Sequence, residues 1–132
     1  MANGLVPIDP ALLALIHGSF QLDGALKPFA REIMLIECHI AGTSHMDLKG
    51  VEEALKPGDV LPLLREPDNA YDGLAIRIMD EEGHHLGYVP RAKNEALARL
   101  MDAGKLLFGR IEEKAWQGEW LKVDIRVFLR DF

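Results

Sequence analysis

An alternating apolar run near the C-terminus is the feature that most constrains the fold of this chain. Between residues 120 and 130 every odd position is apolar and most even positions are charged, and the apolar set is Leu121, Val123, Ile125, Val127 and Leu129. A period of two is typical of a β-strand with one buried face. A second strand is expected over 105–114, and Gln117-Gly118 predicts the turn that joins the two strands.

Earlier segments predict further strands. The residues Met34, Ile36, Cys38 and Ile40 alternate with other side chains from Arg31 onward, which again indicates one buried face. Shorter strands are expected over 60–65, 74–79 and 85–89, with a hairpin turn at Glu81-Glu82-Gly83. Pro62 cannot donate a ladder hydrogen bond, so it predicts a sheet edge or a bulge.

The clearest helix is expected over residues 90–103, where Leu97, Leu100 and Met101 share one face. A short helix is compatible with 51–56. Another is expected over 9–18, because Asp9 suits the N-cap and Pro10 the first helical position. Residues 1–29 are therefore interpreted as an N-terminal helical extension, packed on its own domain or docked on a partner, and residues 30–132 as the main domain.

No regular alternation of strand and helix is present, so a parallel sheet is not expected. We predict a mainly β fold: a small antiparallel OB-like or SH3-like barrel of about six strands, with one helix between strands four and five and a short N-terminal helix.

Composition narrows the functional classes. The formal net charge of −6 argues against a protein that grips long duplex DNA through many phosphates. Cys38 is the single cysteine, so an internal disulfide and a cysteine-rich zinc site are excluded, and its place among apolar residues predicts a core position. No apolar run approaches the roughly 20 residues of a membrane span. We expect a cytoplasmic protein without membrane association.

Two neighbouring motifs carry the functional signal. In Arg65-Glu-Pro-Asp-Asn-Ala-Tyr-Asp72, the Pro-Asp-Asn segment favours a rigid turn that could present Tyr71 and Asp72 to a base or a sugar hydroxyl. The alternative is that these side chains only cap and pack the turn. Tyr88, Arg91 and Lys93 lie where a strand meets a helix start, which suits a phosphate, or else forms an ordinary solvated helical turn.

These motifs, in this order and spacing, resemble the signature of the HIRAN domain family over roughly residues 31–130. The resemblance implies a module that recognises single-stranded DNA, or a DNA 3′ end in some relatives, alongside a helicase or nuclease partner in DNA repair or processing. It implies that Asn69, Tyr71 and Asp72 contact DNA, with Asp72 accepting from a terminal hydroxyl. Tyr88 and Arg91 correspond to a polar ring and a basic residue of the DNA-binding relatives, and Lys93 lies beside them.

One turn departs from the family pattern. DNA-binding relatives carry an Arg and two stacking aromatics after the first strand, whereas this chain reads Gly42-Thr-Ser-His-Met46. Ser44 and His45 are the candidate DNA contacts that remain in this turn, and Trp116 or Trp120 could compensate for the lost rings. Each stacked base is worth about 1–3 kcal/mol. A second hypothesis is therefore a protein-interaction module that kept the barrel and lost DNA-end binding.

No enzymatic chemistry is predicted. A Walker-type phosphate loop is missing from the sequence, and Cys38 and His39 fall on opposite faces of a strand, which rules out a nucleophile–base pair. The spacing of His84-His85, Asp80, His39 and His45 matches no familiar metal site. We expect no enzyme, no cofactor and no metal, with a metal-dependent nuclease as the third hypothesis.

Overall fold

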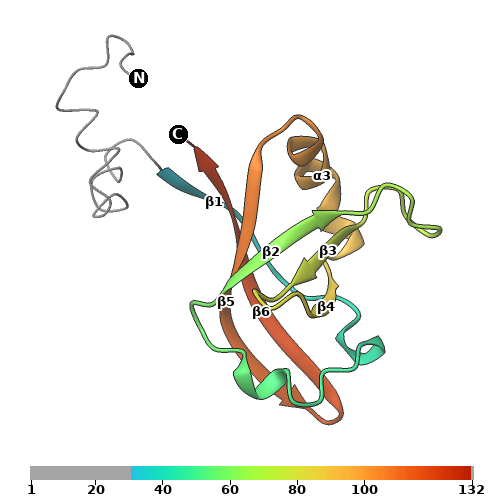
Figure 1. Cartoon of the computed structure of the whole chain (residues 1–132), viewed down its shortest axis with the longest axis vertical. Helices are drawn as coiled ribbons and strands as arrows, with labels where there is room; N and C mark the ends of the chain where they lie inside the picture. The colour runs from blue at the N-terminus through green and yellow to red at the C-terminus, as the bar shows by residue number, and fades with distance from the viewer. Residues whose placement is uncertain (1–30, 132) are drawn as a thin grey trace, which may run out of the picture. The chain divides into compact units, whose positions relative to one another are not determined.

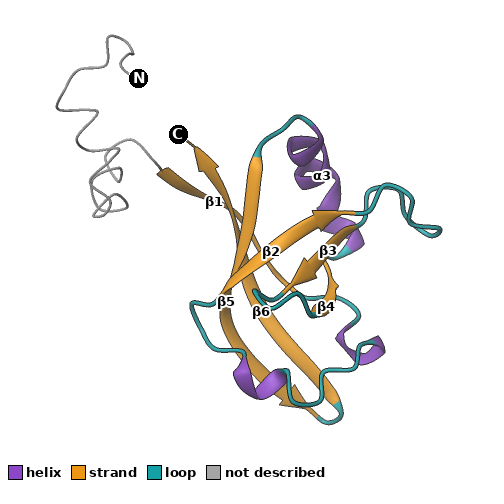
Figure 2. Cartoon of the chain, in the orientation of Figure 1, coloured by secondary structure: helices purple, strands orange, loops and turns teal. Residues whose placement is uncertain are grey.

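A computed structural model describes residues 31–131, and Figures 1 and 2 show the arrangement of their strands and helices. The strands are β1 (Arg31–His39), β2 (Val60–Arg65), β3 (Ile76–Met79), β4 (His85–Tyr88), β5 (Leu106–Gln117) and β6 (Trp120–Asp131). The α-helix is α3 (Asn94–Asp102), and short 3-10 helices are η2 (Thr43–His45), η3 (Glu52–Ala54) and η4 (Arg91–Lys93). Within this stretch no helix has the length and apolar character needed to cross a membrane.

The six strands form one curled antiparallel sheet in the order β1-β6-β5-β2-β3-β4. Its two outer strands meet just past β1, where Ala41 and Tyr88 exchange backbone hydrogen bonds of 2.8 and 2.9 Å. One residue earlier, the Ile40 amide donates to the Val123 carbonyl of β6 at 2.9 Å. The segment that follows β1 thus bonds to both ends of the sheet and makes it a partial barrel, which confirms the predicted fold class and the position of the helix between strands four and five.

Strand β2 forms the bend of this barrel. Its residues Val60–Pro62 pair with β5, whereas Leu63–Arg65 pair with β3. Of the two settings expected for Pro62, an edge or a bulge, the edge is wrong, because β2 lies inside the sheet. Pro62 is the last residue paired with β5, so its missing N–H coincides with the point where the strand changes partner.

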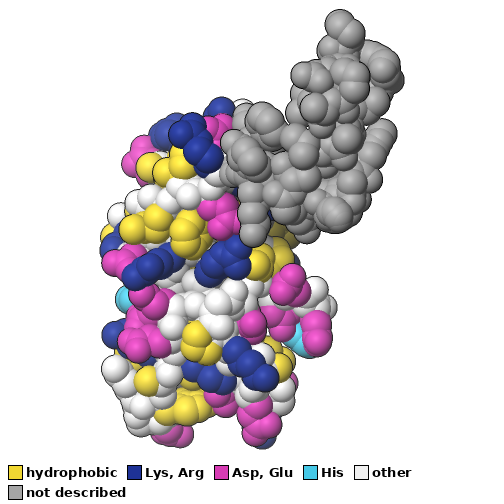
Figure 3. Space-filling view, turned by 90° about the vertical axis from the view of Figure 1, so that its left-hand side faces the viewer, with side chains coloured by type: hydrophobic (Ala, Val, Ile, Leu, Met, Phe, Trp, Pro, Cys, Tyr) yellow, Lys and Arg dark blue, Asp and Glu magenta, His cyan; other side chains and the backbone are white. Residues whose placement is uncertain are grey.

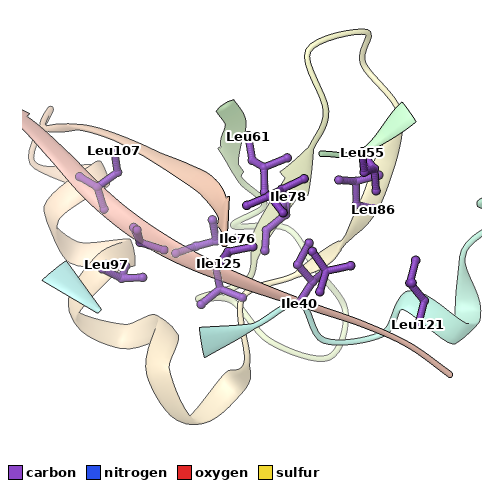
Figure 4. Close-up of a cluster of buried hydrophobic side chains, with 14 of the residues drawn as sticks. Ile40, Leu55, Leu61, Ile76, Ile78, Leu86, Leu97, Leu107, Leu121 and Ile125 are labelled. Atoms are coloured by element: carbon purple, nitrogen blue, oxygen red, sulfur yellow. The ribbon is translucent and has the colours of Figure 1, made fainter. Parts of the chain in front are cut away.

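The long β5–β6 hairpin supplies one wall of the core. Pairing runs from Leu106↔Arg130 to Gln117↔Trp120, around a turn at Gly118-Glu119 and with a bulge between Ile111 and Glu113. The predicted alternation in β6 is confirmed as far as residue 127, because Leu121, Val123, Ile125 and Val127 are at most 3% exposed. They belong to one buried cluster with side chains of the other elements, and Figure 4 labels these members of the cluster: Ile40, Leu55, Leu61, Ile76, Ile78, Leu86, Leu97, Leu107, Leu121 and Ile125.

Some expected details differ. Met34 is 48% exposed, so the apolar face predicted for β1 begins only near Ile36, because β1 is an outer strand that meets β4 only beyond its end. Cys38 packs against the core as expected, and burial raises the pKa of its thiol to about 11.

Several predicted boundaries also shift. The helix expected over 51–56 is only η3, and the helix expected over 90–103 begins as η4 before continuing as α3. The third strand begins at Ile76 instead of at residue 74. The N-terminal helix predicted over 9–18, and the extension that contains it, lie outside the described residues.

The closure of the sheet depends on Gly87. A Cβ there would lie 2.4 Å from the Ala41 carbonyl oxygen and 2.5 Å from Ile40 Cγ2. We expect Gly87→Ala to lower the free energy of unfolding by about 3 kcal/mol, since backbone must move to relieve the overlap. Urea denaturation measures this loss, with Gly50→Ala as the control. Like Gly87, Gly50 has a positive φ, of 77°, but no atom lies near its Cβ position. A loss of only about 1 kcal/mol is therefore expected for Gly50→Ala. Equal losses in the two variants would contradict the steric argument.

Candidate nucleic-acid interface

The loop between β2 and β3 is held by the side chain of Asn69. Its Oδ1 accepts hydrogen bonds from the backbone amides of Tyr71 and Asp72 at 2.8 and 3.0 Å, and its Nδ2 donates to Glu66 Oε1 at 2.8 Å. Asp72 Oδ1 then accepts from the Leu74 amide at 2.9 Å. These local bonds fix the conformation of the corner formed by residues 66–74.

Arg65 anchors this corner to the far end of the helix. Its guanidinium donates to the carbonyls of Gly73 and Ala75 at 3.1 and 2.9 Å, and forms a two-point pair with Asp102 at 2.9 and 3.1 Å. The side chain of Arg65 is only 13% exposed. A bidentate pair of this kind has a strongly preferred geometry, so the corner and the C-terminal end of α3 are held together.

Asn94 and Arg91 anchor the corner to the start of the same helix. Asn94 is 2% exposed, and its Nδ2 donates to Asp72 Oδ2 at 2.8 Å. Arg91 Nη2 donates to the Tyr71 carbonyl at 2.8 Å, and Arg91 Nε lies 3.7 Å from Asp72 Oδ2. The two motifs singled out in the sequence are therefore in direct contact.

Glu66 organises the other side of the corner. Its Oε1 also accepts from the Tyr88 hydroxyl at 2.9 Å, and its Oε2 lies 2.9 Å from Arg77 Nε. The hydrogen bond from Asn69, together with Tyr88 and Arg77, lowers the pKa of Glu66. Burial and the neighbouring Glu66 raise the pKa of Tyr88. The hydroxyl proton of Tyr88 is thus used in the bond to Glu66, so toward a ligand Tyr88 offers its ring and an acceptor oxygen, not a donor.

These contacts frame an open pocket of about 250 Å³. Its lining combines small apolar side chains with polar and charged ones, and the Tyr71 side chain is 86% exposed. The lining residues are Ala41, Asn69, Tyr71, Asp72, Ala75, Tyr88, Val89, Arg91 and Asn94. The pocket can accept a flat, partly apolar group that also carries hydrogen-bonding atoms.

The rim of this pocket is close to neutral. Hydrogen bonds from the Leu74 amide and from Asn94, and the charge of Arg91, lower the pKa of Asp72, so its carboxyl group stays ionised at neutral pH. Arg91 supplies the opposite charge, and its side chain is 75% exposed. The two charges nearest to the pocket therefore offset each other, and only a group placed directly against Asp72 faces its negative carboxylate.

The other expected contacts lie elsewhere. Lys93 Nζ donates to the Glu37 carbonyl at 3.1 Å, outside the pocket. Ser44 and His45 belong to η2, and Ser44 lines a different groove. Among residues 31–131, no group of three or more His, Cys, Asp or Glu side chains is placed to hold a metal ion.

The sequence reasoning missed Asn94 and the role of Glu66. Glu66 was visible within the motif, but its partners come from β3 and β4, distant in sequence. Asn94 carried only a weak signal, namely an amide in the first turn of an amphipathic helix, and its burial depends on how the helix packs.

Known proteins match this chain in sequence pattern and in fold. The sequence pattern of the HIRAN domain matches residues 33–130. A solved protein from Lactobacillus plantarum has a TM-score of 0.72 at 25% identity, covering 78% of this chain and 99% of that one. The crystal structure of the HIRAN domain of human HLTF has a TM-score of 0.59 at 18% identity, and an NMR structure of that domain in its DNA-bound conformation has 0.54 at 17%; each covers 76% of this chain and 79% of the other.

A curated relative was found as well. The Fanconi-associated nuclease 1 homolog of Arabidopsis thaliana is 34% identical over 73 residues, which is 55% of this chain. The match spans only 8% of the length of that nuclease homologue.

The carboxylates of the corner make the stability of the fold depend on pH. Because the pKa values of Glu66 and Asp72 are lowered from 4.5 and 3.8, their contribution is present above those values and is lost as the pH falls through the folded-state values. We expect the urea midpoint to decrease from pH 6 to pH 3, and to decrease less in Glu66→Gln. The exposed Glu81→Gln serves as control, and a Glu66→Gln profile identical to that of the wild type would contradict the assignment.

Proposed function

We propose that this chain, which belongs to the HIRAN domain family, binds single-stranded DNA and receives a terminal nucleotide in the pocket between the 66–74 corner and the start of α3. The direct contact of the corner with the helix start, through Asn94 and Arg91, is the observation that carries the proposal. HLTF supports the choice of ligand, because its HIRAN domain shares this fold and has been solved in a DNA-bound conformation.

The base would be held mainly by stacking. Tyr71 offers an exposed ring, and Tyr88 offers the face of a ring whose hydroxyl is already bonded to Glu66. Every base has an aromatic face, so such contacts tolerate different sequences. The small side chains of Ala41, Ala75 and Val89 leave room beneath the base.

The sugar-phosphate backbone of the DNA would be bound weakly and at few points. Arg91 is the cation on the rim of the pocket, while Asp72 offsets its charge. Arg91 is the single Lys or Arg side chain among the described residues that line the pocket, so few phosphates are neutralised there, and both affinity and salt dependence should be modest. On another face of the molecule, shown in Figure 3, basic and acidic side chains are interleaved.

Asp72 suits recognition of a strand end. Its ionised carboxyl group accepts bonds from Leu74 and Asn94 but retains free acceptor capacity toward the pocket that it lines. A 3′ hydroxyl can donate to it, whereas a phosphate in the same place would be repelled. We accordingly propose recognition of a free 3′ end.

We further propose that the chain serves as an accessory module of DNA repair or processing, with no reaction of its own. The match to the Arabidopsis nuclease homologue supports a setting in which such a domain works beside a nuclease, and a nuclease or helicase partner follows as part of the proposal.

Stacking on Tyr71 can be tested with a 5′-fluorescein-labelled dT12 strand and fluorescence anisotropy. We expect Tyr71→Ala to weaken binding about tenfold, since one stacked base is worth about 1–3 kcal/mol, and Tyr71→Phe to bind like the wild type. Trp116→Ala removes another exposed aromatic ring, one that lies outside the pocket, and should leave binding unchanged. Equal weakening by the Tyr71 and Trp116 substitutions would rule out this pocket as the DNA site.

End recognition can be tested by comparing the same strand with a free 3′ hydroxyl and with a 3′ phosphate. The wild type should prefer the free end by about tenfold, the value of one charge-assisted hydrogen bond, and Asp72→Asn should lose most of that preference. Glu95→Gln, a change in an exposed carboxylate of the first turn of α3, should preserve it. If the wild type binds both ends equally while Tyr71→Ala still weakens binding, single-strand binding stands and the claim of end recognition fails.

A further inference from the structure

A second hollow lies at the closed end of the β5–β6 hairpin. It is larger than the pocket proposed above to bind a strand end, which we call the DNA pocket. It measures about 450 Å³ and is enclosed by the loop that follows β1, by η3 and by the hairpin end. We call it the hairpin groove. Its lining residues are Thr43, Ser44, Met46, Asp47, Leu48, Lys49, Gly50, Glu52, Glu53, Trp116, Glu119 and Leu121.

The hairpin groove forms because the β5–β6 hairpin extends beyond the buried core, so its closed end is only partly covered. Trp116 is paired with Leu121, so both side chains lie on the face of the hairpin that forms the core wall farther along. Leu121 is 3% exposed, whereas Trp116 is 56% exposed. An indole on the core-facing side of a strand is usually buried, whereas residues 31–131 leave more than half of this one exposed.

The opposite wall of the groove is fixed. The Thr43 hydroxyl is buried and donates to the Leu121 carbonyl at 2.7 Å, which ties the loop to β6. Lys114, two residues before Trp116, reaches across to Glu52 Oε2 of η3 at 2.7 Å. The loop after β1 and η3 are thus each hydrogen-bonded to the hairpin, so the groove between them has a defined shape.

Charge indicates what the groove accepts. Asp47, Glu53 and Glu119 line it with no ion-pair partner in the described part of the chain, while Glu52 is matched by Lys114 and one further cation, Lys49, is present. Phosphate would be repelled by this lining. A guanidinium or ammonium group would be attracted to the carboxylates and could lie over the Trp116 ring.

We propose that the hairpin groove docks an extended segment of a partner protein that carries Arg or Lys beside an apolar side chain. The cation would contact Trp116 and the free carboxylates, and the apolar side chain would pack on Met46 and Leu48. This function is separate from DNA binding. The same loop serves both sites, because Ala41 lines the DNA pocket and Thr43 lines the hairpin groove, so a docked partner would sit next to the bound strand end.

The test uses the full chain, ¹⁵N-labelled, and three probe peptides in ¹H–¹⁵N spectra: Gly-Leu-Arg-Gly-Leu-Arg-Gly, and the same peptide with Gln or with Glu in place of both Arg. The Arg peptide should shift the Trp116 indole signal and the amides of residues 44–50, and the Gln peptide should bind about tenfold more weakly. The Glu peptide should produce no shift. Trp116→Phe assigns the indole signal.

Variants separate this site from the DNA pocket. Trp116→Ala and the double variant Glu53→Gln with Glu119→Gln should abolish the peptide response, whereas Tyr71→Ala should leave it intact even if dT12 binding is lost. All of these residues are exposed, so the fold should be retained.

Four results would overturn the proposal. The first is an equal response to the Glu peptide, or none to the Arg peptide. The second is a shift of the Trp116 indole by dT12 without any shift by peptide. The third is a dimer that Trp116→Ala dissociates in sedimentation analysis, which would make a second copy the occupant. The fourth is a set of nuclear Overhauser contacts between Trp116 and residues 1–30 in the free protein, which would make that segment the occupant.

Discussion

The pair of backbone hydrogen bonds between Ala41 and Tyr88 is the contact on which the rest of the molecule depends. It joins the two outer strands of the sheet and places the end of β4, and therefore the start of α3, beside the loop after β1. Both the DNA pocket and the hairpin groove take part of their lining from that loop. The closure is possible because residue 87 is glycine, since any side chain there would overlap the Ala41 carbonyl.

Charge is distributed differently at the two hollows, and this reconciles an acidic chain with a DNA-binding fold. The net charge of −6 would oppose binding to a long polyanion. At the DNA pocket, however, Arg91 and Asp72 balance, so the repulsion is only that of the distant charges, which salt screens. In the hairpin groove, carboxylates outnumber cations around Trp116, so this site favours a positively charged ligand.

The fold was largely predictable from the sequence, because period-two patterns, turn residues and a single amphipathic helix are local signals. The β6 alternation and the hairpin at Gly83 required no knowledge of the rest of the chain. For Pro62 an edge or a bulge was expected, and the change of pairing partner found there is a property of the whole barrel that no local signal reveals. In β1, Met34 matched the pattern and yet is exposed, since sheet order decides which part of an outer strand is covered.

The residues of the candidate site were predictable where they belong to the two sequence motifs, and residues outside the motifs were missed. Asn69, Tyr71, Asp72, Tyr88 and Arg91 come from two motifs of the sequence, and all five line one pocket. Lys93 could not be separated from Arg91 by sequence, because two cations that are two residues apart at a helix start point in directions set by packing. Asn94 was overlooked because a buried amide has no sequence signature of its own.

The anchoring of α3 at both ends has a mechanical consequence. Asn94 fixes its start and Arg65, through Asp102, fixes its last turn, and both connections run to the same corner. A helix held to one corner at both of its ends is restrained from moving relative to that corner. The pocket between them is therefore expected to be formed before any ligand arrives, so that little ordering of the protein is needed on binding.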